Sequence, residues 1–202
     1  MPACSDIPDI TFTHPDMLGF YHNKKLYLNC DYYKANKKFF DEINTQIVLC
    51  NEPYGKYPDD VRFNCIAVDD TLISHTISTP NLIKKSFSKI INVNQGYTKC
   101  STLVMGKAFV TADDGIYHTL LNLGYDCLKI SQGGVMLKGF DYGFIGGAVC
   151  DIGENNLISF GSLDTHPYSN EIKIFANKHS YDIIDFKFSP LYDYGGVIVC
   201  YD

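Results

Sequence analysis

The sequence lacks any long apolar run. No stretch of its 202 residues approaches the roughly 20 consecutive apolar residues that a membrane-spanning helix requires. The first residues, MPACSDIPDI, also lack the basic start and the apolar stretch of a secretory signal peptide. These two absences predict a cytoplasmic protein with no membrane partner.

An excess of basic residues is absent as well. Lys and Arg number 17 against 23 for Asp and Glu, so the formal net charge at pH 7 is -6. Proteins that bind nucleic acids or anionic membranes usually present a basic face. The charge balance therefore argues against nucleic acid as a partner, and the 46% hydrophobic content predicts a globular core.

The eight cysteines contain no CxxC pair, and none of them has a metal-ligand spacing with a histidine. A chain with this much hydrophobic material can fold without disulfides, although disulfides remain the alternative. We expect free thiols that pack as small buried hydrophobes. No metal and no cofactor are predicted.

What the sequence does contain is an internal repeat. Residues 63–93, 99–130 and 146–188 each read as strand, tight turn, strand, helix and strand. The turns are expected at Asp69-Asp70, at Gly106-Lys107 and between Gly153 and Asn156, where turn-forming residues separate two β-rich runs. The repeating unit is therefore predicted to be ββαβ.

The N-terminal stretch fits the same unit with its first strand missing. Residues 24–50 read as strand, helix and strand, and the missing strand is predicted in residues 195–200, GGVIVC. Pairing of 195–200 with 25–30 would close a ring of units and leave no open edge. We expect a single domain over residues 1–202, with residues 1–22 as a surface arm and the repeats from about 24 to 202. The alternative is a mixed α+β domain with only generic alternation of strands and helices.

A ring of ββαβ units with Gly-Gly before an inner strand, as at 146–147 and 195–196, resembles the pentein fold. That fold is the α/β propeller of the guanidino-group-modifying enzymes, the amidinotransferases and deiminases among them. Within it, the chain resembles a bacterial family of undetermined activity. The resemblance covers roughly residues 24–202 at the level of the repeat pattern. Four units are clear where the fold has five, and residues 131–145 would be the remnant of a fifth.

The resemblance also implies a site. In deiminase-type members a Gly-Gly-rich strand near the C-terminus ends in the nucleophilic cysteine, and Cys200 follows GGVIV at that spacing. A histidine then transfers protons and carboxylates hold the guanidinium, roles that would fall to His166 and Asp164. Tyr168 departs from the pattern, because it stands where the family commonly has an acidic residue. The resemblance further implies substrate-binding roles for Asp113, His75 and Asp151.

Each of these residues has a simpler explanation. Cysteines occupy similar early points in other units, at Cys65, Cys100 and Cys150, so packing alone accounts for Cys200. Asp113 is placed to cap a helix. Because the catalytic set looks incomplete, the predicted function is a binding module for a small cationic guanidino-type ligand. The alternative is a Cys-dependent hydrolase or amidinotransferase-like enzyme acting on a guanidino compound.

Overall fold

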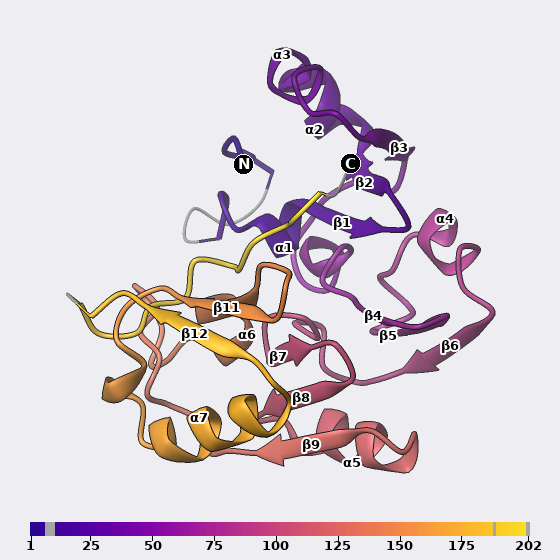
Figure 1. Ribbon diagram of the computed structural model, residues 1–202. Helices are drawn as coiled ribbons and strands as arrows, with labels where there is room; N and C mark the ends of the chain where they lie inside the picture. Colours follow the sequence, from indigo (N-terminus) through magenta and orange to yellow (C-terminus); the bar gives the residue numbers. More distant parts are fainter. Residues whose placement is uncertain (7–10, 188, 201–202) are drawn as a thin grey trace.

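The computed structural model describes residues 1–6, 11–187 and 189–200 (Figure 1). Four units follow one another along the chain, and each contains a three-stranded sheet. The first unit consists of α1 (Pro15–Leu18), β1 (Gly19–His22), β2 (Lys25–Asn29), α2 (Cys30–Ala35), α3 (Lys37–Phe40) and β3 (Gln46–Cys50). The second unit consists of η1 (Asp59–Val61), β4 (Ile66–Val68), β5 (Thr71–Ser74), α4 (Asn81–Lys84) and β6 (Lys89–Asn92).

The third and fourth units follow the same order. They consist of β7 (Thr102–Met105), β8 (Ala108–Thr111), α5 (Asp114–Asn122) and β9 (Asp126–Lys129), then α6 (Ile145–Ala148), β10 (Val149–Asp151), β11 (Asn156–Ser159), η2 (Leu163–Thr165), α7 (Ser169–Lys178) and β12 (Asp182–Asp185).

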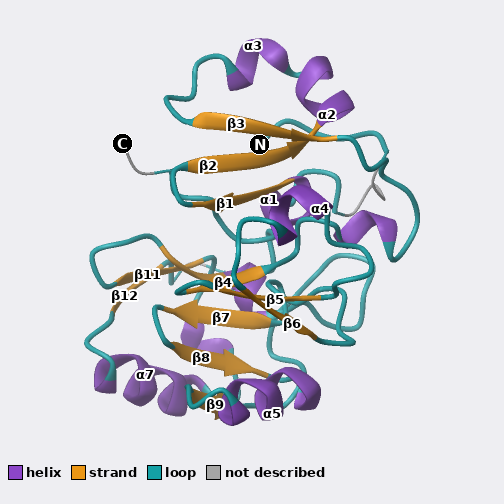
Figure 2. Ribbon diagram, turned by 90° about the vertical axis from the view of Figure 1, so that its right-hand side faces the viewer, coloured by secondary structure: helices purple, strands orange, loops and turns teal. Residues whose placement is uncertain are grey.

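All four sheets share one topology. The first two strands form an antiparallel hairpin, and the third strand lies parallel to the second after a helical crossover, as in β4-β5-β6. Figure 2 shows the sheets edge-on with α5 and α7 outside them. The hairpins turn at Asp69-Asp70 and at Gly106-Lys107, where the strands break. The predicted ββαβ repeat is therefore confirmed.

The N-terminal unit differs from the prediction. β1 pairs with β2 in register Gly19↔Leu28, and β2 also pairs with β3, so both edges of β2 are occupied. The predicted pairing of 195–200 with 25–30 is wrong, and residues 1–22 are not an arm, because they contain α1 and β1. The physical reason is local: Asn23 and Lys24 both adopt positive φ (48° and 58°), which closes a two-residue hairpin without any distant strand.

The C-terminal segment nevertheless joins the last unit to the first. The carbonyl oxygen of Gly195 accepts a hydrogen bond from the amide of Asp16 at 3.2 Å. The amide of Gly196 donates to the carbonyl oxygen of Gly147 at 3.0 Å. Ile198 then packs on the buried cluster of the first unit, and Figure 1 shows this yellow segment running past α1 toward β2. The connection is an extended crossing segment, and no strand is assigned to it among the described residues.

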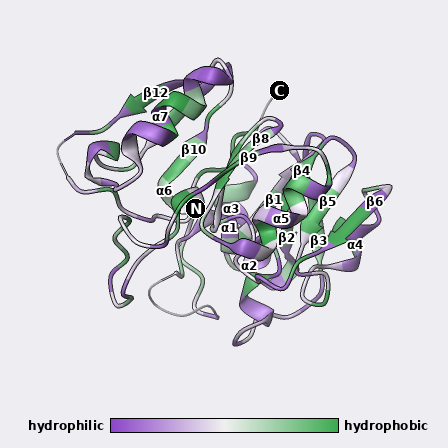
Figure 3. Cartoon of the chain, turned by 90° about the horizontal axis from the view of Figure 1, so that it is seen from below, coloured by the Kyte–Doolittle hydropathy of each residue, from purple (hydrophilic) through white to green (hydrophobic). Residues whose placement is uncertain are grey.

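Neighbouring units share their cores. One buried cluster joins Tyr27 of the first unit to Leu72 of the second, a further cluster joins Ile73 to Phe109, and the largest joins Val110 to Leu157. Most strands are coloured as hydrophobic in Figure 3, whereas much of α7 is hydrophilic. Each pair of neighbouring units along the chain therefore shares a buried apolar cluster. In the described part of the chain no helix has the length and apolar character needed to cross a bilayer.

Helix α5 shows how a unit is built from its sequence. Asp113 is its N-cap and accepts a hydrogen bond from the amide of Ile116 at 2.8 Å, as predicted. Gly124, with φ +83°, follows the C-terminus in the left-handed region that glycine adopts readily. Ile116 and Leu120 are buried on the sheet side, whereas Leu121 is 42% exposed. The predicted buried face is confirmed.

Replacing Leu120 by Ala should lower the free energy of unfolding by about 3 kcal/mol, because it opens a cavity in a fully buried cluster. Urea unfolding followed by circular dichroism measures this change. Leu121→Ala is the matched control, since it makes the same chemical change on the exposed face and should alter stability by less than about 0.5 kcal/mol. Equal losses for the two variants would contradict the assigned face.

Candidate functional site

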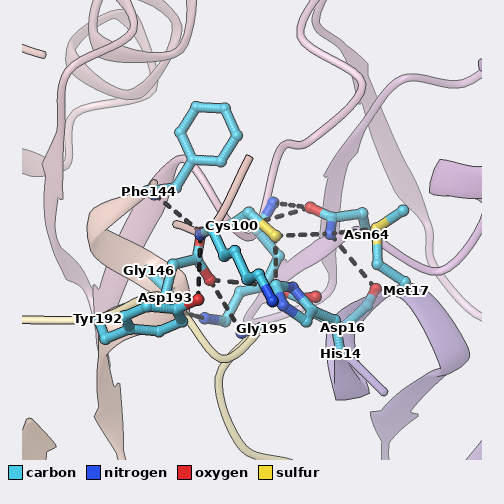
Figure 4. Close-up of polar contacts among 12 residues, drawn as sticks. His14, Asp16, Met17, Asn64, Cys100, Phe144, Gly146, Tyr192, Asp193 and Gly195 are labelled. Carbon is cyan, nitrogen blue, oxygen red and sulfur yellow. Dashed lines mark hydrogen bonds and ion pairs between the residues drawn. The ribbon is translucent and has the colours of Figure 1, made fainter. Parts of the chain in front are cut away.

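The candidate site is a group of buried polar side chains where the leading ends of the units meet (Figure 4). Asp16 lies in α1 just before β1, Asn64 lies two residues before β4, and Cys100 lies two residues before β7. Asp193 comes from the segment after β12, and His14 precedes α1. These five residues, each no more than 6% exposed, are called the central cluster below.

A thiol and a carboxylate face each other within the central cluster. Cys100 Sγ donates to Asp16 Oδ2 at 2.6 Å and accepts from Asn64 Nδ2 at 3.2 Å. The Oδ1 atom of Asn64 accepts from the backbone amides of Lys99 (2.7 Å) and Cys100 (3.0 Å), which fixes the orientation of the amide. Asp16 Oδ1 is buried and has no hydrogen-bond partner among the described residues. An unpaired buried acceptor is costly, so this oxygen is a candidate for accepting a ligand donor.

A second carboxylate, Asp193, is held by the backbone. Its Oδ2 accepts from the amide of Phe144 and its Oδ1 from the amide of Gly195, each at 2.9 Å. His14 Nδ1 lies 3.9 Å from Asp193 Oδ1. Burial lowers the pKa of His14, and this outweighs the attraction of Asp193. Burial therefore works against a charged ring at this contact.

Burial controls the electrostatics of the cluster. It raises the pKa of Asp16 to about 7, with the charge of Asp193 adding to the shift. Burial likewise raises the pKa of Asp193, and it raises the pKa of the Cys100 thiol well above its usual value. Lys99 supplies one nearby positive charge, and its Nζ donates to the carbonyl oxygen of Gly146 at 3.2 Å. Burial thus penalises the ionised forms of both carboxyl groups, and a cation that arrives beside them would favour those forms.

Two cavities flank the central cluster. The first, of about 320 Å³, is lined by Asp16 together with residues of β1, of β4 and of the segment 197–199. The second, of about 260 Å³, is lined by His14, Cys100 and Asp193 and by four aromatic side chains, and we call it the aromatic cavity. A small ligand in either cavity would contact the cluster.

The structure separates the residues predicted to be catalytic. Cys200 is half-buried among apolar side chains such as Leu26 and Phe40, and burial raises the pKa of its thiol. His166 lines a different, small cavity of about 20 Å³, where its Nδ1 accepts from the amide of Tyr168 at 3.1 Å. Asp164 is exposed and forms an ion pair with Lys173. Cys200 and His166 therefore do not share a cavity.

The residues predicted to bind substrate are also dispersed. Asp113 lines the same small cavity as His166, and its Oδ2 accepts from Gln95 at 3.2 Å. His75 contacts the hydroxyl of Ser78 through Nδ1 at 3.0 Å. Asp151 lines the first cavity and accepts from the Tyr181 hydroxyl at 2.8 Å. The structure thus brings together only His166 and Asp113 from the predicted set, and the functional roles of all six remain predictions.

Six of the eight cysteines are buried, as expected for side chains that pack as small hydrophobes. Burial raises the pKa of Cys50 and of Cys65 to about 12. Within the described part of the chain, no three His, Cys, Asp or Glu side chains come together as a metal-binding group.

Sequence reasoning missed the central cluster. Asp16 lay within the predicted arm, and no predicted strand or helix contained Asp193. The available signal was positional, because Asp16, Asn64 and Cys100 each lead into the first strand of a unit. Asn64 and Cys100 each lie two residues before a first strand, and Asp16 lies three residues before one.

A family model described as a family of unknown function (DUF6873) matches residues 1–198. The chain belongs to DUF6873. No curated protein sequence matches it. Among solved structures, a dimethylarginine dimethylaminohydrolase in an adduct with S-methyl-L-thiocitrulline is 10% identical, with a TM-score of 0.53 over 91% of this chain and 72% of that one.

Two further solved structures are similar to this DUF6873 chain at TM-scores of 0.49 and 12% identity. They are DDAH from Pseudomonas aeruginosa complexed with citrulline and the product-bound N-terminal domain of ArgZ, an arginine dihydrolase from cyanobacteria. Each match covers 76% of this chain but only 63% and 62% of the respective relative, so this chain spans less than two thirds of their lengths. The likeness above a TM-score of 0.5 shows the fold: this chain has the mixed α/β pentein fold of the guanidino-group-modifying enzymes, as predicted.

Proposed function

We propose that this protein binds a small cationic ligand of the guanidino type at the central cluster and acts as a binding module. The observation that carries the proposal is the buried oxygen Asp16 Oδ1, which has no hydrogen-bond partner among the described residues and lies in the same cluster as the carboxylate of Asp193. A guanidinium group is planar and carries five N–H donors, which suits it to bridge two carboxylates. Such a ligand would satisfy the unpaired oxygen and neutralise charge that burial penalises.

We further propose that the four units are blades of an α/β propeller around the central cluster, within a single domain. In support, Asp16, Asn64, Cys100 and Gly146 come from the leading ends of successive units and meet in one place. Gly146 is tied to the cluster through its amide, which donates to the carbonyl oxygen of Cys100 at 2.8 Å. The segment 195–198 supports closure, since it bridges the fourth unit and the first.

The binding proposal predicts a specific pH dependence. Asp16, with a pKa of about 7, must be ionised to hold the cation. The apparent affinity for agmatine should therefore rise as the pH increases from 5.5 to 8, by up to about tenfold per pH unit below the pKa of Asp16. Isothermal titration calorimetry at several pH values, in buffers of different ionisation enthalpy, measures both the affinity and the released proton.

Two variants test whether this dependence belongs to the central cluster. Asp16→Asn should lose at least about tenfold in affinity and lose the pH dependence, because the amide cannot carry the negative charge. Asp164→Asn is the matched control, since this exposed carboxylate lies outside the cluster and both cavities. Equal binding to both variants, or equal binding of the neutral urea analogue of agmatine, would refute the proposal.

A second candidate is a Cys-dependent hydrolase acting on the same ligand class, and the contact between Cys100 Sγ and Asp16 Oδ2 favours it. Asp16 would accept the thiol proton, and the thiolate would attack the guanidinium carbon and expel an amine that carries a proton away. Water would then release a urea product and restore the thiol. The raised pKa of Cys100 ranks this function second, because the free thiol is a weak nucleophile at pH 7.

The enzymatic alternative at the predicted trio also remains a proposal, with Cys200 as nucleophile, His166 as acid–base and Asp164 as its partner. Mass spectrometry of protein incubated with agmatine separates the possibilities. A covalent adduct lost in Cys100→Ser would support the central thiol, and one lost only in Cys200→Ser would support the trio. Binding without any adduct or urea product supports the binding module.

A further inference from the structure

The aromatic cavity lies on one side of the central cluster, and aromatic residues form much of its wall. Four aromatic side chains line it, namely Tyr97, Phe140, Tyr142 and Phe144. The cavity also opens on the thiol of Cys100 and the carboxylate of Asp193, so a ligand that reaches the cluster from this side lies among aromatic rings. With about 260 Å³ of space, it suits a small organic molecule rather than a polymer.

Stacking supports the rings of this wall. The ring of Tyr97 stacks on the ring of Phe144, with centroids 5.8 Å apart. The ring of Tyr57 also stacks on Tyr97, with centroids 6.0 Å apart. Tyr142 meets Phe144 edge-on at 6.4 Å. Pre-positioned rings bind planar or apolar groups with little loss of side-chain entropy, and their faces attract cations. The wall therefore favours an apolar body attached to a positive charge.

The lining of the aromatic cavity carries acidic residues and His14, and Lys99 acts on Asp193 from the neighbouring first cavity. The acidic residues of the aromatic cavity are Asp141 and Asp193, and none of the described lining residues is lysine or arginine. The chain positions outside the described part contain no lysine or arginine either. Lys99 lines the first cavity instead and donates to a backbone carbonyl. A ligand carboxylate in the aromatic cavity would meet two aspartates and no lysine or arginine among the described lining residues.

We infer that the ligand of the central cluster is a cation without a carboxylate group, and that its apolar or aromatic body lies in the aromatic cavity. This inference rests on the proposed binding of guanidino-type cations and names the ligand class within it. Free amino acids such as arginine are excluded by their carboxylate. Alkyl and aryl guanidines, and decarboxylated amines such as agmatine, belong to the preferred class.

A matched pair of probes isolates the carboxylate. Benzylguanidine and 4-(guanidinomethyl)benzoate share a guanidinium and a ring, and they differ only by the carboxylate. Calorimetric titration of the full chain should show benzylguanidine binding at least about tenfold more tightly. Benzylurea, the neutral analogue, should bind more weakly than benzylguanidine. Arginine should likewise bind at least about tenfold more weakly than agmatine.

Protein variants test the position of the ligand body. Phe140 is 58% exposed, so its side chain can be truncated without opening the core. Phe140→Ala should lower the affinity for benzylguanidine by about five- to tenfold. Phe39→Ala is the control, because Phe39 is an exposed phenylalanine that lines a different cavity, and it should leave the affinity unchanged. Leu137→Arg places a cation on the aromatic cavity and should improve binding of 4-(guanidinomethyl)benzoate relative to benzylguanidine.

The outcomes separate the two proposals. Equal affinity for the two members of the matched pair, together with sensitivity to Asp16→Asn, would overturn the inference and leave the proposed function standing. If Phe39→Ala lowered the affinity for benzylguanidine and Phe140→Ala did not, the proposed position of the ligand body would be overturned. The inference and the proposed function would both be overturned if no guanidine bound, or if Asp16→Asn left the binding of every guanidine unchanged. The predicted order of probes, with the Phe140 effect, would support both.

Discussion

Replacing Asp16 by Asn should stabilise the protein at pH 8 and remove most of the loss in stability that the wild type shows between pH 4 and pH 8. Burial raises the pKa of Asp16 from its ordinary value of 3.8 to about 7 in the folded protein. Between these values the folded chain retains a proton that the unfolded chain has released. The free energy of unfolding therefore falls as the pH rises through this window, and it levels off above the folded pKa.

The expected size of this effect is large. A shift of about three pKa units corresponds to on the order of 4 kcal/mol of stability, which is a sizeable part of the total for a domain. Asn keeps the shape of Asp and its oxygen can still accept from the Cys100 thiol, so the variant removes the titration without opening a cavity. Asp193 and His14 titrate in both proteins, so the difference between the two curves reports Asp16 together with its coupling to Asp193.

Urea unfolding of wild type and variant at several pH values measures the difference curve. Asp164→Asn is the control: its carboxylate is exposed, and the ion pair with Lys173 lowers its pKa. Its stabilising contribution is present at neutral pH and is lost only as the pH falls through that lowered pKa, outside most of the window. Parallel stability curves for wild type and Asp16→Asn would show that Asp16 titrates normally.

A stabilising variant that no longer binds its ligand would fit a functional role for the buried charge. Asp16 has one orphan oxygen and a like charge in the same cluster, an arrangement that folding alone does not reward. Native proteins tolerate such costs mainly where binding or chemistry needs them. The stability measurement and the titration with agmatine therefore test one idea from two sides.

The ββαβ plan could be predicted from sequence because its signals are local. The turns at Asp69-Asp70 and Gly106-Lys107, and the cap at Asp113, depend on a few neighbouring residues. The first hairpin was missed because Asn23-Lys24 lacks the glycine that usually marks a two-residue turn. Both residues nevertheless adopt the required positive φ, and the pairing of β1 with β2 stabilises them there.

The site could not be predicted in the same way, because it arises from contacts between distant units. Asp16 and Cys100 are 84 positions apart, and Asp193 lies nearly at the other end of the chain. Nothing in the neighbouring residues of any of them indicates burial. The family resemblance directed attention to Cys200 and His166, which the structure places in separate cavities. Burial of these carboxylates becomes evident only when the leading ends of the units converge.

Gly146→Ala should cost more than about 3 kcal/mol or prevent folding, because the backbone of α6 approaches the third unit too closely for a side chain. A Cβ atom at Gly146 would lie well inside 3.0 Å of the carbonyl oxygens of Thr102 and Lys99. These are backbone atoms at and just before the start of β7, so they cannot rotate away as a side chain could. The substitution would push the fourth unit from the third and disturb the hydrogen bond between Gly146 and Cys100.

Two other glycines are controls that separate a steric clash from the effect of replacing glycine by alanine on the backbone itself. Gly115 lies within α5, and Gly115→Ala should change stability by less than about 1 kcal/mol, because the helix preference of Ala opposes the 3.3 Å approach of its Cβ to Asp113 Oδ1. Gly124 has positive φ with no atom within 4 Å of its Cβ position, so Gly124→Ala should cost only about 1 kcal/mol of backbone strain. Thermal and urea unfolding of the three variants provide the comparison. If Gly146→Ala costs no more than Gly124→Ala, the close approach of the two units, and with it the packing around the central cluster, would be wrong.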